Sequence, residues 1–136
     1  MEFQESSRQL MRHFVEGDWV LVLSKLTLME LGGAPAQVRA RLKEVPEEHI
    51  EVLQVDVEAR DLANAYVSES VISEGFRANA QHIAMATLAR VDVLVSWNFK
   101  HIVNLHRIHG YNSVNLRRGY HLLEIRTPWE VLPEDE

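Results

Sequence analysis

The chain has 136 residues, the size of one domain, and its 20 Asp and Glu against 14 Lys and Arg give a formal net charge of −6. A hydrophobic fraction of 46% with 25% charged residues excludes wholesale disorder, and the absence of cysteine excludes a disulfide scaffold, a thiolate zinc site and a thiol nucleophile. The longest apolar run, residues 19–23, is too short to span a bilayer, and the acidic start does not resemble a signal peptide. We therefore expect a cytoplasmic protein without membrane association.

Apolar periodicity and the positions of Gly and Pro predict alternating helices and strands. In chain order, the expected elements are a helix over 5–16, a strand over 19–23, helices over 27–31 and 35–45, a strand over 50–55, helices over 57–70 and 79–88, a strand over 93–97, a helix over 101–108 and a strand over 122–125.

Three of these helices have a recognisable start signal. Thr27 and Glu30 have the spacing of a capping box, in which a hydroxyl and a carboxylate satisfy backbone N–H groups. Asp56 is a good N-cap for the helix over 57–70, and Asn79 is expected to cap or begin the helix that follows it. Capping alone would explain both Glu30 and Asn79, so these residues are not assigned to a site by this pattern.

Alternation of strands and helices predicts an α/β fold with a mostly parallel sheet, in a single domain over 1–136 that ends in a polar tail from about residue 132. Ligand sites of such sheets lie beyond the carboxyl ends of the strands. The polar residues that follow the first and third expected strands are Ser24, Thr27, Glu30, Ser96, Asn98 and Lys100.

A basic stretch lies within this acidic chain. Residues 93–123 contain Lys100, Arg107, Arg117 and Arg118 and no acid, with histidines, asparagines and aromatic residues between them. Such a composition is typical of a nucleic-acid contact, with Lys100, His101 and Arg107 as the candidate binding residues. An acidic protein partner or a solvated surface would explain the same charges.

Three segments resemble the PIN-domain family, and in particular the prokaryotic subgroup related to VapC-type toxins of toxin–antitoxin pairs. They are SKLTLMEL at 24–31, ANAQHIAMA at 78–86 and VLVSWNFKH at 93–101, and the stretch over 119–128 is also similar to that subgroup. The resemblance covers roughly residues 4–131. It implies a three-layer α/β/α fold around a five-stranded parallel sheet, and hydrolysis of RNA by Mg²⁺ or Mn²⁺ held between acidic side chains.

The resemblance assigns the catalytic and metal-binding positions to Glu30, Asn79 and Asn98. Only Glu30 carries a negative charge, whereas the family has an aspartate at position 79 and an aspartate or asparagine at position 98. An amide oxygen can ligate a cation but adds no charge, and affinity depends on the charge of the ligands. We therefore expect divalent-metal binding to be weak or absent and the endoribonuclease to be inactive or impaired.

The family's first, central strand and its aspartate have no counterpart in the sequence. Four explanations remain: a start later than that of the natural gene, a separate polypeptide that supplies the strand, a homodimer that shares an element, or a sheet that closes around the gap. Two functions stay open. One is a PIN-like ribonuclease with impaired hydrolysis, with RNA as substrate and an antitoxin as a further partner. The other is a non-catalytic RNA- or protein-binding PIN remnant or a subunit of a split assembly.

Overall fold

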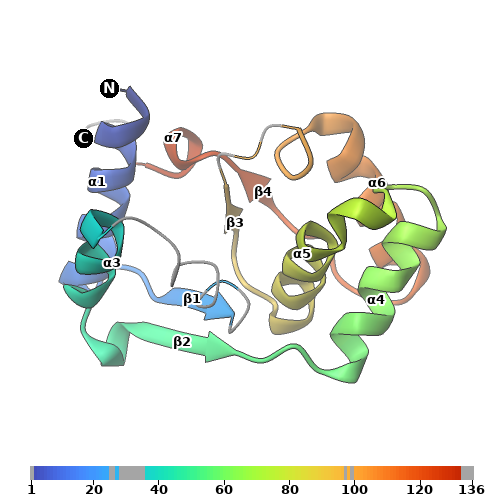
Figure 1. Cartoon of the computed structure of the whole chain (residues 1–136), viewed down its shortest axis with the longest axis horizontal. Coiled ribbons are helices and arrows are strands. Elements are labelled where there is room, and N and C mark those ends of the chain that lie inside the picture. Colours follow the sequence, from blue (N-terminus) through green and yellow to red (C-terminus); the bar gives the residue numbers. More distant parts are fainter. Residues whose placement is uncertain (1, 25–26, 28–35, 97, 99, 133–136) are drawn as a thin grey trace. The chain divides into compact units, whose positions relative to one another are not determined.

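A computed structural model describes residues 2–24, 27, 36–96, 98 and 100–132 and shows a mixed α/β protein with short parallel strands (Figure 1). The chain divides into two compact units. The first comprises Met1–Gln54 with Pro128–Glu136, and the second comprises Val55–Thr127. The expectation of an α/β fold with parallel strands is confirmed, while the PIN-like arrangement of layers stays a prediction.

The first unit contains a two-stranded parallel sheet, in which β1 pairs with β2 from Leu21 opposite Ile50 to Ser24 opposite Leu53. In chain order its elements are α1 (Glu2–Glu16), β1 (Leu21–Ser24), α3 (Ala36–Lys43), the 3-10 turn η1 (Glu47–His49), β2 (Ile50–Leu53) and α7 (Pro128–Val131). α1 contacts α7. The helix expected over 27–31 lies outside the described residues except for Thr27, which is helical.

Gly17 ends α1 and allows it to lie against η1. Its φ of +85° is a left-handed conformation that favours glycine. A Cβ at this position would lie 2.8 Å from the His49 ring. The same ring donates from Nδ1 to the carbonyl of Phe14 at 2.9 Å. Glycine is therefore required both by the backbone and by the close approach of His49.

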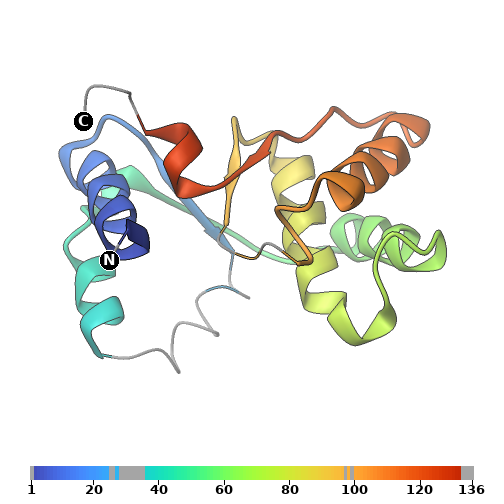
Figure 2. The ribbon, with the colours of Figure 1, turned by 90° about the horizontal axis from the view of Figure 1, so that it is seen from above.

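The second unit packs three helices beside a second two-stranded sheet. In chain order its elements are α4 (Val57–Ser68), the 3-10 turn η2 (Glu74–Phe76), α5 (Arg77–Ala89), β3 (Leu94–Val95), α6 (Leu105–Arg117) and β4 (Ile125–Arg126). α4 contacts both α5 and α6 (Figure 2). β3 pairs in parallel with β4, with Leu94 opposite Ile125. Small residues of α4 and α5 let these two helices approach closely, since Ala59, Ala63, Ala80 and Ala84 are all buried.

A buried polar network joins the three helices of the second unit. The Tyr66 hydroxyl of α4 donates to Asn115 Oδ1 of α6 at 2.5 Å. Asn115 Nδ2 donates to Thr87 Oγ1 of α5 at 3.3 Å, and the Thr87 hydroxyl donates to the Ile83 carbonyl at 2.9 Å. Asn115 also bonds Asn112 Oδ1, which in turn accepts from the Leu123 backbone at 2.7 Å. Because buried polar groups need partners, this network fixes how α6 lies on α4 and α5.

Two helix starts differ from the sequence predictions. Asp56 caps α4 as predicted, since its Oδ1 accepts from the Ala59 N–H at 2.8 Å. Asn79 does not cap α5, because the 3-10 turn η2 runs directly into the helix and makes Phe76 the N-cap. The helix expected over 101–108 instead spans Leu105–Arg117, since the Asn104 side chain accepts from the Arg107 N–H at 3.2 Å and starts it there.

The single expected sheet is also not what the described residues contain. They form two separate two-stranded sheets, one in each unit, and their strands are shorter than predicted. β3 and β4 are two residues each, against the five expected at 93–97 and four at 122–125. Within the part of the chain that the structure describes, no helix combines the length and apolar character needed to cross a membrane.

Candidate nucleic-acid interface

The predicted site residues fall in different parts of the structure. Glu30 lies outside the described residues, so its assignment to a metal site stays a prediction. Ser24, at the end of β1, bonds Thr27: its Oγ accepts from the Thr27 N–H at 2.9 Å and lies 3.0 Å from the Thr27 hydroxyl. The Ser24 side chain is therefore engaged by Thr27. Asn79, Asn98, Lys100, His101 and Arg107 all belong to the second unit.

Asn98 organises the turn that follows β3. Its backbone N–H donates to Ser96 Oγ at 3.0 Å, and its Oδ1 accepts from the His101 N–H at 3.0 Å. Its carbonyl accepts from Ile102 at 3.2 Å and from Val103 at 2.7 Å. This is the N-cap use of asparagine, in which the side-chain oxygen accepts from the backbone N–H three residues on. Asn98 thus places His101 relative to the end of the strand.

A stacked ring pair brings the start of α5 to this turn. Phe76, the N-cap of α5, stacks on His101 with ring centroids 3.8 Å apart and planes inclined by 29°. Asn79 is the third residue of α5 and is half-buried. The start of α5, which carries Asn79, therefore contacts the turn that carries Asn98 and His101.

The described donors do not by themselves fit a divalent cation. Asn79 and Asn98 are neutral amides, and the Asn98 oxygen already accepts a backbone hydrogen bond. Among the described residues, no group of three or more His, Asp or Glu is placed to hold a metal ion. Mg²⁺ and Mn²⁺ need several oxygen ligands with negative charge among them, which these two amides do not supply.

Two acids near this region are already engaged by cations. Glu74 forms an ion pair with Arg77, from Nη2 to Oε2 at 2.5 Å, and the salt bridge lowers the pKa of this exposed carboxyl. Glu69 pairs with Arg117 of α6. The second pair also means that Arg117 is partly neutralised. The positive charge next to the Asn98 turn therefore comes from Lys100 and Arg107 rather than from Arg117 at the C-terminal end of α6.

Arg107 is held in a fixed position by two carbonyl groups. Its Nε donates to the Lys100 carbonyl at 3.2 Å, and its Nη1 donates to the Val71 carbonyl. Among the described residues, Nη2 has no partner. Gly110 allows α6 to approach the loop here, because a Cβ would lie 2.8 Å from Val71 Cγ1. A guanidinium fixed along one edge presents its remaining N–H groups in a defined direction, which suits a phosphate.

His101 serves as the base of the ring stack. Its side chain is buried, with 8% of the residue exposed, and its Nδ1 has no hydrogen-bond partner among the described residues. Burial, reinforced by the charges of Arg107 and Lys100, lowers the pKa of His101. The lowered pKa favours the neutral form of the ring at pH 7. The Tyr111 hydroxyl donates to the His101 carbonyl at 2.7 Å, and this fixes the backbone beneath the ring.

Of the predicted binding residues, the structure brings Lys100, His101 and Arg107 together. Phe76 completes the group and was not predicted, because residues 71–77 were interpreted only as a connector. The residue is 40% exposed although one face of its ring covers His101. An aromatic residue directly before a helix start is the sequence signal that points to it. We call Phe76, Lys100, His101 and Arg107 the aromatic–cation cluster.

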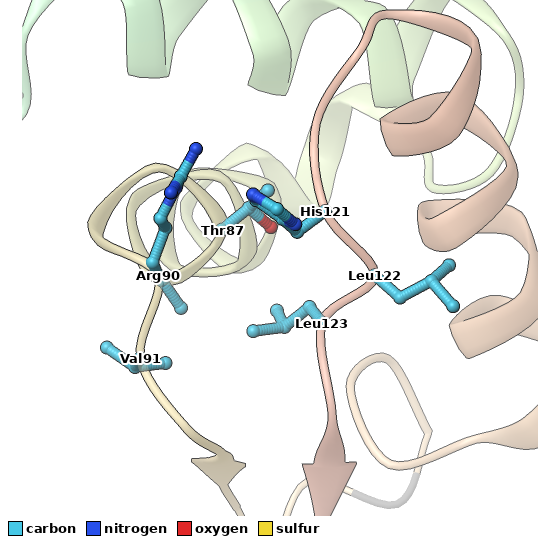
Figure 3. Close-up of a pocket in the computed structure, with 7 residues that line it drawn as sticks. Thr87, Arg90, Val91, His121, Leu122 and Leu123 are labelled. Atoms are coloured by element: carbon cyan, nitrogen blue, oxygen red, sulfur yellow. The ribbon is translucent and has the colours of Figure 1, made fainter.

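A shallow cavity of about 250 Å³ lies elsewhere in the second unit, at the end of α5 (Figure 3). Its lining includes Thr87, Arg90, Val91, His121 and Leu123. Thr87 already bonds within the buried network, and Arg90 is the left-handed C-cap of α5 with φ of 56°. The carboxyl end of a helix disfavours an anion, so this cavity is a weaker candidate than the aromatic–cation cluster.

Comparisons with family models, with curated proteins and with solved structures find no significant match to this chain. The resemblance to the PIN-domain family accordingly rests on the sequence segments alone.

Proposed function

We propose that this chain is a PIN-like protein of the Mg²⁺- or Mn²⁺-dependent ribonuclease class that binds RNA through Lys100 and Arg107, with the buried His101 as the base of the ring stack, and whose hydrolysis is inactive or impaired. The class comes from the resemblance of the segments at 24–31, 78–86 and 93–101. The observation that carries the RNA-binding part is the fixed Arg107 guanidinium beside Lys100.

Physical chemistry supports phosphate binding at this place. Arg107 is already ordered by the carbonyls of Lys100 and Val71, so less side-chain entropy is lost when it binds a ligand. The stretch over 93–123 contains no acid, so nothing within it repels a polyanion. The charge of the whole chain is −6, and binding is therefore expected to be local rather than a general coating of RNA.

Impaired hydrolysis follows from the charge of the predicted ligands. With Asn79 and Asn98 in place of carboxylates, Glu30 is the only charged residue that the resemblance assigns to the metal. Two-metal hydrolysis needs cations that activate water and stabilise the leaving oxygen. A site with one carboxylate would hold such cations weakly.

A non-catalytic binding module is the second candidate function. It is favoured by Asn98, whose side-chain oxygen is used to build the turn beneath His101 rather than being left for a cation. In that case the protein has the binding surface but does not hydrolyse RNA, and its partner is RNA or an acidic protein.

Metal titration separates the two candidates. The unfolding temperature and the cleavage of a labelled single-stranded RNA are measured with and without Mg²⁺ or Mn²⁺. Cleavage that requires the metal and is lost in Glu30→Gln supports the ribonuclease. The cleavage rate is expected to be far below that of a site with three carboxylates. If the metal neither raises the unfolding temperature nor supports cleavage, the ribonuclease hypothesis is rejected and the binding module is retained. Cleavage that survives Glu30→Gln overturns the site assignment.

A further inference from the structure

Phe76 is the one large aromatic side chain of the aromatic–cation cluster, and its surroundings leave part of the ring open. The residue is 40% exposed, and one face of its ring lies on the His101 imidazole. It has no other ring contact among the described residues. Single exposed apolar residues are normal on a protein surface, so Phe76 is distinguished by its stack on His101, which lies beside Lys100 and the Arg107 side chain, rather than by its exposure.

The base of the stack is rigid. His101 is held by the Asn98 side chain at its N–H and by the Tyr111 hydroxyl at its carbonyl. Phe76 is fixed at its own N–H, which donates to the Ser73 carbonyl at 3.0 Å. The Phe76 ring is supported on one face by the His101 imidazole and its backbone is held at the N–H, so it loses little entropy when a further flat group stacks on it.

The cations near the Phe76 ring suit the phosphate group of a nucleotide whose base lies on the ring. Arg107 Nη2 is without a partner among the described residues, and Lys100 is exposed. Glu74, the nearest acid along the chain, is neutralised by Arg77. An aromatic platform with adjacent fixed cations is the arrangement by which proteins bind single strands, with a base on the ring and the phosphate on the cations.

We infer that Phe76 is a stacking platform for one unpaired base of a single-stranded RNA whose neighbouring phosphate is bound by Arg107 and Lys100. This inference rests on the proposed RNA-binding function and adds the residue that contacts a base. Double-stranded RNA does not fit, because its bases are stacked on each other and unavailable to the ring. Stacking is tolerant of base identity, so little sequence preference is expected at this position.

The test compares a labelled oligouridine of twelve nucleotides with an abasic ribose-phosphate oligomer of the same length, by fluorescence anisotropy at low salt. The proteins are the wild type, Phe76→Leu and Phe76→Trp. Trp129→Leu is the control, because Trp129 is an aromatic residue of similar exposure, 39%, in the first unit. Loss of a stacked base is expected to weaken oligouridine binding by about 5- to 150-fold in Phe76→Leu. Phe76→Trp and Trp129→Leu should bind oligouridine as tightly as the wild type or more tightly.

The abasic oligomer distinguishes stacking from charge. It should bind the wild type and Phe76→Leu equally, and more weakly than oligouridine binds the wild type. If the wild type binds both oligomers equally, or if Phe76→Leu binds oligouridine unchanged, the platform is overturned while RNA binding by the cations stands. If folded wild-type protein binds neither oligomer, the proposed function fails together with the platform. Should Phe76→Leu not fold, the comparison of the two oligomers on the wild type still decides the inference.

Discussion

The buried hydroxyl of Tyr66 gives the sharpest test of how the second unit is held together. The substitution Tyr66→Phe removes one oxygen from α4 and leaves the ring, which packs edge-on against Tyr111 with centroids 5.1 Å apart. Asn115 Oδ1 then loses the donor that lies 2.5 Å away. Both residues are 0% exposed, so water cannot replace the missing hydroxyl without opening the core.

The magnitude follows from the asymmetry of buried hydrogen bonds. Leaving a buried acceptor without its partner costs about 1–3 kcal/mol, whereas removing both partners is less costly. Asn115 keeps its two donor contacts to Thr87 and Asn112, so the loss is confined to Oδ1. We expect Tyr66→Phe to lower the free energy of unfolding by about 2 kcal/mol.

Urea denaturation followed by circular dichroism measures this change, with the slope against urea unchanged. Tyr120→Phe is the matched control, because the Tyr120 hydroxyl bonds Glu58 at an exposed position, at 2.9 Å, and its loss should cost less than about 0.5 kcal/mol. A double-mutant cycle with Asn115→Leu should show non-additive losses, since both changes remove the same bond. Equal stability of Tyr66→Phe and the wild type would refute the network as the link between α4 and α6.

Three further predictions concern single positions in the second unit. Asp56→Ala removes the α4 N-cap and should lower the free energy of unfolding by about 1 kcal/mol in the same urea assay, whereas an unchanged midpoint would contradict the cap. Burial raises the pKa of Tyr111 to about 12, above the value of about 10 in an unfolded chain, so the neutral phenol stabilises the fold. That contribution is full below about pH 10 and is lost as the pH rises toward 12; alkaline titration of unfolding should show a steeper decline than in Tyr111→Phe, and parallel curves would contradict it. Gly110→Ala places a Cβ against Val71 and should destabilise by about 1–3 kcal/mol, with relief by the added change Val71→Ala; a fully stable Gly110→Ala would show that the loop yields freely.

Local signals of the sequence predicted the parts of the fold that depend on neighbours in the chain. Asp56 was recognisable as an N-cap because capping needs only the following three residues. The start of α5 was placed at Asn79 because nothing in its own segment reveals that the turn Glu74–Phe76 continues into the helix. The helix expected from His101 starts at Leu105 instead, because the Asn104 side chain caps α6 there.

Contacts between distant segments account for what the sequence could not predict. Charge composition singled out Lys100, His101 and Arg107, and the structure places them together. The role of Phe76 depends on a ring contact across 25 positions of the chain, for which periodicity gives no signal. Glu30 remains a prediction from the resemblance alone.

The salt dependence of RNA binding tests the central claim most directly. Each phosphate contact of a single strand adds about −0.7 to the slope of log affinity against log salt. The account predicts that Lys100→Glu with Arg107→Glu weakens binding of single-stranded RNA and reduces the steepness of this slope by about 1.4. Arg39→Glu with Lys43→Glu, the same charge change on exposed positions of α3, should leave the slope unchanged. Equal slopes for the wild type and both variants would contradict the assignment of RNA to Lys100 and Arg107.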